Sequence, residues 1–124
     1  MAAKAPIRIP QVSILMPFKN TSAYLQECLN SVTDQNFDSW ELIAVDDHSS
    51  ESSLAVLTKW AMRDSRIRVY SNQGRGIIHA LRTAYAHSRG RLITRMDSDD
   101  RMAQGRLVEM AGQLQTSGFG QIAH

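Results

Sequence analysis

Short apolar runs and segments of helical periodicity alternate along the whole chain. Residues 12–16 form a nearly continuous apolar run that ends at Pro17, and residues 40–45 form a second run that ends at two aspartates. Runs of this length are typical of strands that are buried on both faces of a parallel sheet. Residues 67–70 alternate apolar and polar positions, which indicates a strand near the edge of the sheet. Residues 91–96 complete a set of four expected strands.

After each expected strand, apolar residues recur at the spacing of one helix face. Asn20-Thr21-Ser22 offers N-cap side chains for the first helix, and Ser49 or Ser50 offers one for the second. Glu51 falls in the first turn of the second helix, where a negative charge complements the helix dipole. The apolar positions of the four expected helices are Leu25, Cys28, Leu29 and Val32; Leu54, Leu57 and Ala61; Ile77, Ile78, Leu81, Ala84 and Tyr85; and Leu107, Met110, Ala111 and Leu114.

The order strand then helix, repeated as four βα units with short connections, predicts an α/β fold. Strands separated by helices favour right-handed crossovers, which give an open, mostly parallel, Rossmann-like sheet with helices on both faces. We expect residues 1–11 to be a flexible lead-in, residues 12–117 to form the folded part, and residues 118–124 to be a loop-like tail.

Composition places the chain among ordinary globular proteins, since 43% of its 124 residues are hydrophobic and 21% are charged. The single cysteine, Cys28, favours a reducing compartment, and neither a spanning apolar run nor a secretory signal is expected. Arginine is concentrated between residues 63 and 106, a segment that contains ten arginines and four aspartates. This excess suits a phosphate-bearing ligand, an anionic membrane surface or simply a solvated face. Nucleic acid is the least favoured partner, because aromatic residues are not interleaved with the arginines.

Polar residues collect where the expected strands end. The four sets are residues 17–20, 46–50, 71–72 and 97–100. Because ligands bind beyond the carboxyl ends of parallel strands, we expect all four sets to lie on one edge of the sheet.

The last set contains three carboxylates, Asp97, Asp99 and Asp100. Carboxylates this close repel one another, and a hard divalent cation such as Mg²⁺ or Mn²⁺ relieves that repulsion. The alternative is that they cap the next helix in a solvated turn. Asp46 and Asp47 are equally open to two interpretations, since they suit either a strand-to-helix turn or hydrogen bonds to a base or ribose.

Other motifs have the wrong spacing for their usual chemistry. The segment Gly74-Arg75-Gly76 lacks the third glycine of a dinucleotide-binding fingerprint, and residues 97–108 lack the side chains of an EF-hand loop. His79 and His87 fall two turns apart on one expected helix, and we interpret both as surface or packing residues.

The motifs in this order resemble those of the family 2 glycosyltransferases with the GT-A fold. The resemblance covers about residues 12–114, and it is carried by the stretches 12–20, 24–37, 40–50 and 90–100. It implies that this chain is the nucleotide-sugar-binding part of a GT-A domain, without the acceptor-binding half.

The resemblance also implies roles for individual residues. Pro17, Phe18 and Asn20 would cradle the nucleotide base, and Asp47, beside Asp46, would recognise it, most often as uracil. Asp97 would hold ribose or sugar hydroxyls and take part with Asp99 in a site for Mn²⁺ or Mg²⁺ that bridges the diphosphate. Arg82 would approach the phosphates. Two positions depart from the family pattern: His48 replaces a usual glycine, and we assign Phe18 to the place of a common tyrosine.

The expected activity is transfer of a hexose from a nucleoside diphosphate sugar, with UDP-sugar as the first choice, to a hydroxyl of a carbohydrate or lipid-linked acceptor. The general base is expected beyond His124, so this stretch alone should be weakly active or inactive. We expect a cytoplasmic location, with peripheral association at the inner face of the membrane left open. The alternatives are a non-catalytic α/β module that binds an anionic partner, and a related nucleotidyltransferase.

Overall fold

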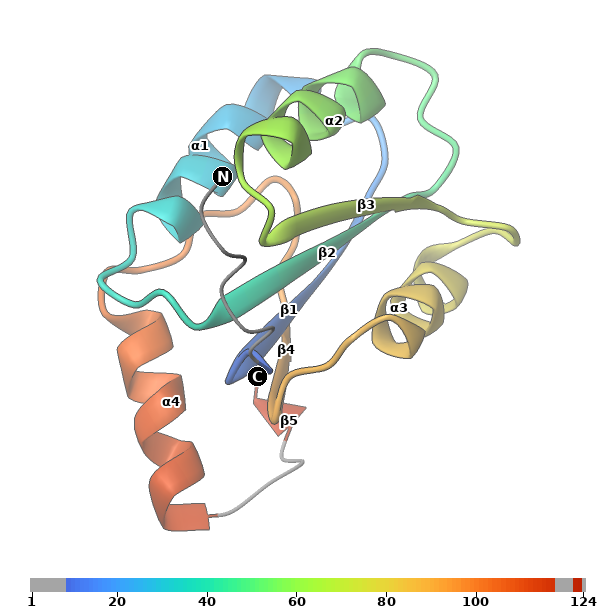
Figure 1. Ribbon diagram of the computed structural model, residues 1–124. Helices are drawn as coiled ribbons and strands as arrows, with labels where there is room; N and C mark the ends of the chain where they lie inside the picture. The colour runs from blue at the N-terminus through green and yellow to red at the C-terminus, as the bar shows by residue number, and fades with distance from the viewer. Residues whose placement is uncertain (1–8, 118–121, 124) are drawn as a thin grey trace, which may run out of the picture.

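A five-stranded parallel sheet lies at the centre of the computed structural model, which describes residues 9–117 and 122–123 (Figure 1). The strands are β1 Val12–Phe18, β2 Trp40–Asp46, β3 Ile67–Ser71, β4 Leu92–Arg95 and β5 Ile122–Ala123. The helices are α1 Ser22–Thr33, α2 Ser53–Arg63, α3 Ile77–Ala86 and α4 Arg106–Ser117. Every strand pair is parallel, in the order β3-β2-β1-β4-β5, so the predicted α/β fold is confirmed.

Strand β5 is the part of the sheet that the sequence pattern missed. Its two residues pair in parallel with Ile93 and Thr94 of β4, where we expected a loop-like tail. Two residues are too few to show any periodicity, so only the pairing reveals this strand. The loop predicted at residues 118–120 and the lead-in at residues 1–8 lie outside the described residues.

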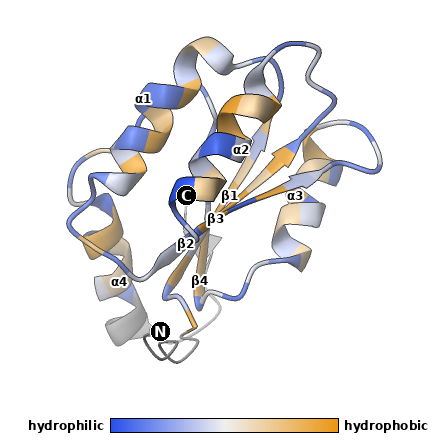
Figure 2. Ribbon diagram, turned by 45° about the horizontal axis from the view of Figure 1, so that its top comes forward, coloured by the Kyte–Doolittle hydropathy of each residue, from blue (hydrophilic) through white to orange (hydrophobic). Residues whose placement is uncertain are grey.

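Helices cover both faces of the sheet and leave β1 and β2 buried on both sides. Val12, Ile14 and Met16 of β1 pack in the cluster that also holds residues of α1, α2 and α4, whereas Leu15 packs with Ala80 of α3. Figure 2 shows the apolar sides of the helices turned toward the sheet. This double burial explains why the first two apolar runs are nearly continuous. No helix in the described part of the chain is long and apolar enough to cross a bilayer.

The starts of α1 and α2 differ from the predicted capping. Neither Thr21 nor Ser52, the residues at the two N-cap positions, makes a side-chain capping bond. Instead, the carboxylate of Glu51 accepts hydrogen bonds from the backbone N–H of Ser53 at 2.7 Å and of Ser22 at 3.1 Å. One acidic side chain therefore serves both helix N-termini, which is a favourable place for negative charge.

The strand order places a topological switch point between β1 and β4. From β1 the chain adds β2 and then β3 on one side, and it returns through α3 to add β4 on the other side (Figure 1). Strands β2 and β4 therefore flank β1, and a reversal of strand order of this kind favours a binding crevice at the carboxyl ends of the strands. The polar sets after the four strands lie at this edge, as predicted.

Candidate functional site

A cavity of about 280 Å³ opens at the switch point. Residues from the ends of β1, β2 and β4 and from the start of α3 surround it: Pro17, Phe18, Lys19, Thr21, Asp47, Ile77, Asp97, Ser98 and Asp99. The structure therefore brings the aspartates that follow β2 and β4 to one cavity, where the sequence placed them. This shared rim is the geometry on which a metal and diphosphate site depends.

The loop after β4 separates its three carboxylates. Asp97 accepts a hydrogen bond from the Arg95 guanidinium at 3.2 Å, and Asp100 turns back to accept one from the N–H of Arg101 at 2.9 Å. Asp100 does not line the cavity. The carboxylate of Asp99 is exposed and makes no hydrogen bond or ion pair within the described part of the chain. Asp97 and Asp99 are thus the two carboxylates of this loop that line the cavity.

The serine between the two aspartates attaches this loop to the rest of the fold. Ser98 is buried, and its Oγ accepts a hydrogen bond from Thr21 Oγ1 at 2.8 Å. This contact ties the β4 loop to the start of α1. Two carboxylates suit Mg²⁺ or Mn²⁺, which fill the remaining positions with water and substrate phosphates. The described residues contain no group of three or more histidine, cysteine or acidic side chains placed to hold a metal ion.

Asp46 and Asp47 have different roles although they are adjacent. Asp46 is buried and accepts a hydrogen bond from the N–H of Ser49 at 3.1 Å, so it stabilises the turn after β2 and does not line the cavity. Asp47 does line it. Desolvation opposes ionisation of Asp47, but hydrogen bonds from Asn72 and Gly76 and the charge of Lys19 lower its pKa. The turn interpretation therefore fits Asp46 and the binding interpretation fits Asp47.

Phe18, which we expected to help cradle the nucleotide base, borders the cavity but is buried. Phe18 is only 2% exposed, because alternate residues of β1 face the layer of α1, α2 and α4, and its ring packs in that core. Lys19 follows it, is exposed and lines the cavity. The cavity therefore has an exposed cation next to the buried ring of Phe18. The period-two alternation of the strand was the signal that could have separated the two residues.

Asn20 connects two loops instead of facing the cavity. Its Oδ1 accepts a hydrogen bond from the N–H of Ser50 at 2.8 Å, and its own N–H donates to Ser49 Oγ at 3.1 Å. Its φ of 54° is left-handed, a conformation that asparagine tolerates. Asn20 therefore shapes the site by holding the loop after β2 against the loop after β1.

His48 also has a left-handed backbone, with φ of 61°. Glycine adopts this conformation without steric cost, which explains why a glycine is usual at this position in the family pattern. His48 Nε2 lies 2.7 Å from the carbonyl oxygen of Gly74, so the imidazole reaches the segment that precedes α3. His48 therefore links the loop after β2 to the segment before α3.

Arg82, which we expected to approach the phosphates, does not line the cavity in this structure. Ile77, at the start of α3, lines the cavity, whereas Arg82 is exposed and does not. Arg82 lies more than one turn further along the helix, roughly 7 Å from Ile77 along the axis.

Asn72 is the site residue that the sequence analysis left without a role. It is 3% exposed, and its Nδ2 donates to Asp47 Oδ1 at 2.9 Å. The backbone N–H of Gly76 donates to the same oxygen at 3.0 Å and to Oδ2 at 3.2 Å. His79, which we interpreted as a surface or packing residue, bonds through Nδ1 to Asn72 Oδ1. The segment before α3 therefore orients the carboxylate of Asp47.

The sequence model for glycosyl transferase family 2 matches residues 13–123 of this chain. The chain belongs to glycosyl transferase family 2. Its relatives include the uncharacterized glycosyltransferase EpsJ of Bacillus subtilis, which is 34% identical over 110 residues, a stretch that covers 86% of this chain and 32% of EpsJ. The chondroitin synthase of Pasteurella multocida is 34% identical over 93 residues, covering 75% of this chain and 10% of that protein.

Two solved structures share the fold of this family 2 chain. TarS from S. aureus, in complex with UDP-GlcNAc, has a TM-score of 0.78 at 25% identity, and the match covers 86% of this chain and 31% of TarS. The mannosyltransferase PcManGT from Pyrobaculum calidifontis, in complex with GDP-Man and Mn²⁺, has a TM-score of 0.71 at 25% identity, with 85% and 32% covered. These matches confirm the expected GT-A fold. The chain spans about a third of the length of these structures and of EpsJ.

Arg66 and Arg68, two of the arginines that could have formed an anion-binding face of this family 2 chain, bind acidic side chains within it. Arg66 forms ion pairs with Asp64 at 2.8 Å and Asp38 at 3.9 Å, and its guanidinium lies 4.0 Å from the ring centroid of Trp40. Arg68 forms an ion pair with Glu41, which is buried. Both arginines line a cavity of about 340 Å³ that also contains Glu41. The structure therefore favours a structural role for Arg66 and Arg68 over recognition of an anionic partner.

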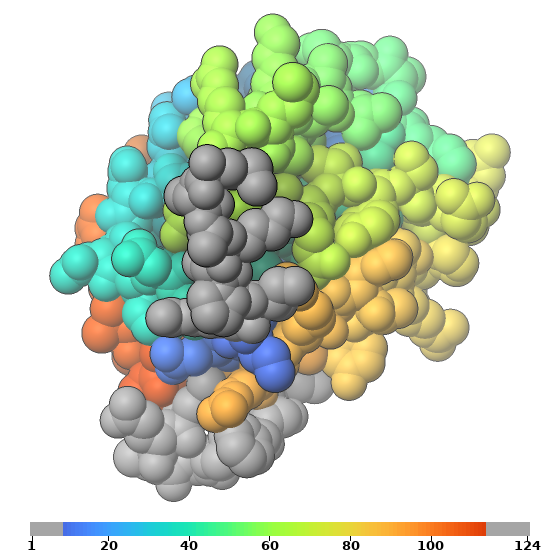
Figure 3. Space-filling view, viewed as in Figure 1, coloured from blue at the N-terminus to red at the C-terminus, as the bar shows by residue number. Residues whose placement is uncertain are grey.

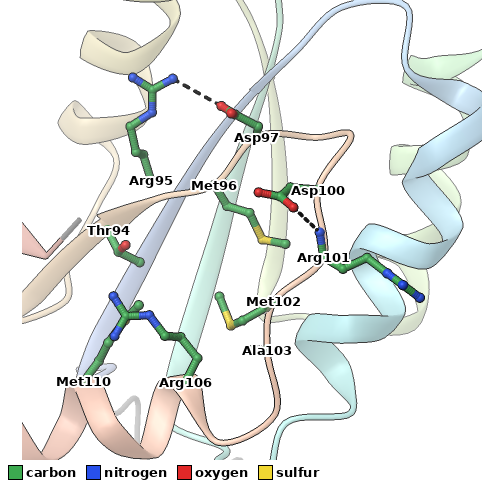
Figure 4. A pocket seen from close by; sticks show the side chains of 10 residues that line it. All are labelled: Thr94, Arg95, Met96, Asp97, Asp100, Arg101, Met102, Ala103, Arg106 and Met110. Carbon is green, nitrogen blue, oxygen red and sulfur yellow. Dashed lines mark hydrogen bonds and ion pairs between the residues drawn. The ribbon is translucent and has the colours of Figure 1, made fainter.

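A further cavity of about 290 Å³ lies between β4 and α4 and shares Asp97 with the first. Figure 4 shows the sulfur atoms of Met96 and Met102 beside this space and the Arg95–Asp97 ion pair at one end of it. Asp97 thus lies between the cavity at the switch point and the cavity against α4.

Proposed function

We propose that this chain binds a nucleoside diphosphate sugar, and that it is the donor-binding part of a hexosyltransferase. The observation that carries the proposal is the shared rim: Asp47 after β2 and the pair Asp97 and Asp99 after β4 line one cavity at the switch point. Family membership supplies the class of reaction. The geometry supports a division of the cavity between a base at Asp47 and a diphosphate at Asp97 and Asp99.

UDP-sugar is our first choice of donor. Asp47 carries a lowered pKa and is a hydrogen-bond acceptor at neutral pH, so it suits a base that presents an N–H, as uracil does. Lys19 lies on the same cavity and adds a positive charge for an anionic ligand. TarS was solved with UDP-GlcNAc and PcManGT with GDP-Man, and both uracil and guanine carry a ring N–H.

A divalent cation fits the same proposal. Asp97 and Asp99 would hold Mn²⁺ or Mg²⁺ on the cavity side of the β4 loop, which Ser98 anchors to Thr21. The bound ion would stabilise the negative charge of the departing nucleoside diphosphate. The side chains themselves would orient the donor, and Asp97 would also accept hydrogen bonds from ribose or sugar hydroxyls.

The acceptor side of the reaction is proposed for the whole protein. We propose that a carbohydrate or lipid-linked acceptor and the general base that deprotonates its hydroxyl belong to a part of the protein other than the described residues. This chain alone would then bind its donor better than it transfers the sugar. We further propose that the whole protein works in the cytoplasm, with peripheral attachment to the membrane as one arrangement.

Calorimetry with a panel of nucleoside diphosphates in the presence of Mn²⁺ tests the proposed function. We expect UDP to bind and Asp47→Ala to lose that binding. Asp38→Ala is the matched control, because this carboxylate is fully exposed beside the arginines at the other cavity. The proposal fails if no nucleoside diphosphate binds, or if Asp47→Ala binds UDP like the wild type.

A second experiment identifies the reaction class. A whole protein that contains this chain should release UDP from UDP-sugar when it is given an acceptor. Release of inorganic pyrophosphate from UTP and a sugar 1-phosphate, in a parallel assay, would instead indicate a nucleotidyltransferase, which shares the same metal chemistry.

A further inference from the structure

Asp47 is held by a chain of hydrogen bonds that ends on α3. Asn72 Nδ2 donates to Asp47 Oδ1, and Asn72 Oδ1 is bonded to His79 Nδ1. Asp47 Oδ1 receives a second bond from the N–H of Gly76, while Oδ2 receives only the longer contact from that N–H. Oδ2 therefore keeps the greater capacity to accept a hydrogen bond from a ligand.

The surroundings of Asn72 define which way its amide points. Its Nδ2 faces two acceptors, Asp47 Oδ1 at 2.9 Å and the carbonyl oxygen of Gly76 at 3.3 Å. Its Oδ1 faces two nitrogens, the N–H of Gly74 at 3.3 Å and His79 Nδ1. Reversing the amide would place its carbonyl oxygen against the carboxylate of Asp47, and a buried amide without matched partners is costly.

The ring of His79 occupies a place that the chain leaves open for it. A Cβ at Gly74 would lie 2.6 Å from Cδ2 of His79, so a side chain at position 74 would displace the imidazole. Because Asn72 Oδ1 can only accept, the Nδ1 atom of His79 carries the proton in this bond. Gly74 and Gly76, which fit no dinucleotide-binding fingerprint, thus have a joint role: one admits the imidazole and the other donates to Asp47.

The position of this network supports an effect on ligand binding. Asn72 is buried directly behind Asp47, which faces the cavity, and His79 is on the exposed side of the same network. The segment from Asn72 to Gly76 leads from β3 into α3 and protrudes beside that helix in the space-filling view (Figure 3). A change at His79 can therefore reach the carboxylate without removing any group that lines the cavity.

We propose that His79 is a positioning residue that sets base selectivity: it fixes the amide of Asn72 so that Asp47 presents an accepting oxygen to the base. This inference rests on the proposed function. A base with a ring N–H at its pairing edge, such as uracil, donates to that oxygen. Cytosine has a lone pair at the same ring position and is repelled by it.

The ratio of UDP affinity to CDP affinity tests this proposal, measured by calorimetry in the presence of Mn²⁺. The wild type should favour UDP by about tenfold or more, the equivalent of one well-placed hydrogen bond. In His79→Ala the amide oxygen of Asn72 loses one of its two donors, and the ratio should fall by about threefold or more. His79→Asn keeps an amide nitrogen near the place of Nδ1 and should restore the ratio to within about twofold of the wild-type value.

Gly74→Ala provides a second variant that leaves histidine in the chain but displaces its ring, and we expect it to lower the ratio as His79→Ala does. Equal weakening of UDP and CDP in both variants would show a merely structural role and would overturn the proposal. An unchanged ratio in His79→Ala would overturn it too, while leaving the proposed function intact. Failure of the wild type to bind UDP at all would instead remove the proposed function, and this inference with it.

Discussion

Asp47 and Asp97 follow different strands, β2 and β4, and line the same cavity. Strand β1 separates these two strands in the sheet, so the cavity spans the switch point at which the strand order reverses. The cation of Lys19, at the end of β1, lies on the same cavity. An acceptor for a base, a cation and a pair of possible metal ligands are thus arranged along one edge by strand order alone.

Substitutions at Lys19 and at Phe18 should affect different properties: the first should affect UDP binding and the second the stability of the fold. Because Lys19 faces the cavity, we expect Lys19→Gln to weaken UDP binding by about tenfold, as the loss of a charge-assisted contact does, with little change in stability. Phe18→Leu should lower the free energy of unfolding by about 1 kcal/mol, because it alters a packed core, and should leave UDP affinity unchanged. Calorimetry and urea unfolding of both variants check this. If UDP bound more weakly to Phe18→Leu than to Lys19→Gln, Phe18 and not Lys19 would be the residue that contacts the ligand.

Glu51 should make stability depend on acid pH. Hydrogen bonds from Ser22 and Ser53 lower the pKa of Glu51 from 4.5 to about 2 in the folded state. The unfolded chain therefore binds this proton first, and the stabilisation is fully present above pH 4.5 and is lost as the pH falls toward 2. We expect Glu51→Gln to be less stable than the wild type at neutral pH and to converge with it in acid.

Urea unfolding at a series of pH values measures this difference. Glu27→Gln is the matched control, because Glu27 is exposed and its ion pair with Arg101 is long, at 3.9 Å. Parallel stability curves for the wild type and Glu51→Gln between pH 4.5 and 2 would contradict a shared cap for α1 and α2.

Arg68 should contribute to the stability of the fold and not to the binding of an anionic partner. Burial raises the pKa of Glu41, but bonds from Ser13, Arg89 and Arg68 outweigh it and lower the pKa overall. Removing one donor in Arg68→Met should cost about 1–3 kcal/mol of unfolding free energy, because the buried carboxylate loses a charged partner. Arg75→Met, at an exposed position, should stay within about 0.5 kcal/mol of the wild type. If Arg68→Met left the free energy of unfolding unchanged, Arg68 would have no structural role, and the arginines would again be candidates for binding an anionic partner.

The order of strands and helices could be predicted because it depends on burial that leaves a pattern in the chain. Strand β1 is apolar at nearly every position because α3 covers one face and the other three helices cover the opposite face. The alternation in β3 reflects its place at the edge of the sheet. Polar sets at the strand ends then fall on one edge, so Asp47 and Asp97 could be brought together from the sequence.

The remaining features depend on geometry that leaves no such pattern. Whether Phe18 or Lys19 is exposed at the cavity depends on where the strand ends, because successive residues of a strand point to opposite faces of the sheet. The roles of Asn72 and His79 arise from hydrogen bonds between side chains seven residues apart, across the start of a helix. The reach of Arg82 depends on where α3 begins, and β5 is too short to be periodic. Residues 1–8 and 118–121 fall outside the described chain.

The mutual dependence of Mn²⁺ and UDP binding tests the account most directly. Because coupling between two ligands is reciprocal, each should strengthen the binding of the other by one factor, which we expect to be about tenfold or more in the wild type. Asp99→Asn should bring that factor close to one, whereas Asp47→Asn should weaken UDP binding and leave the factor unchanged. The shared metal and diphosphate site would be contradicted if Mn²⁺ did not change the UDP affinity of the wild type. It would also be contradicted if Asp99→Asn kept the wild-type coupling factor between Mn²⁺ and UDP.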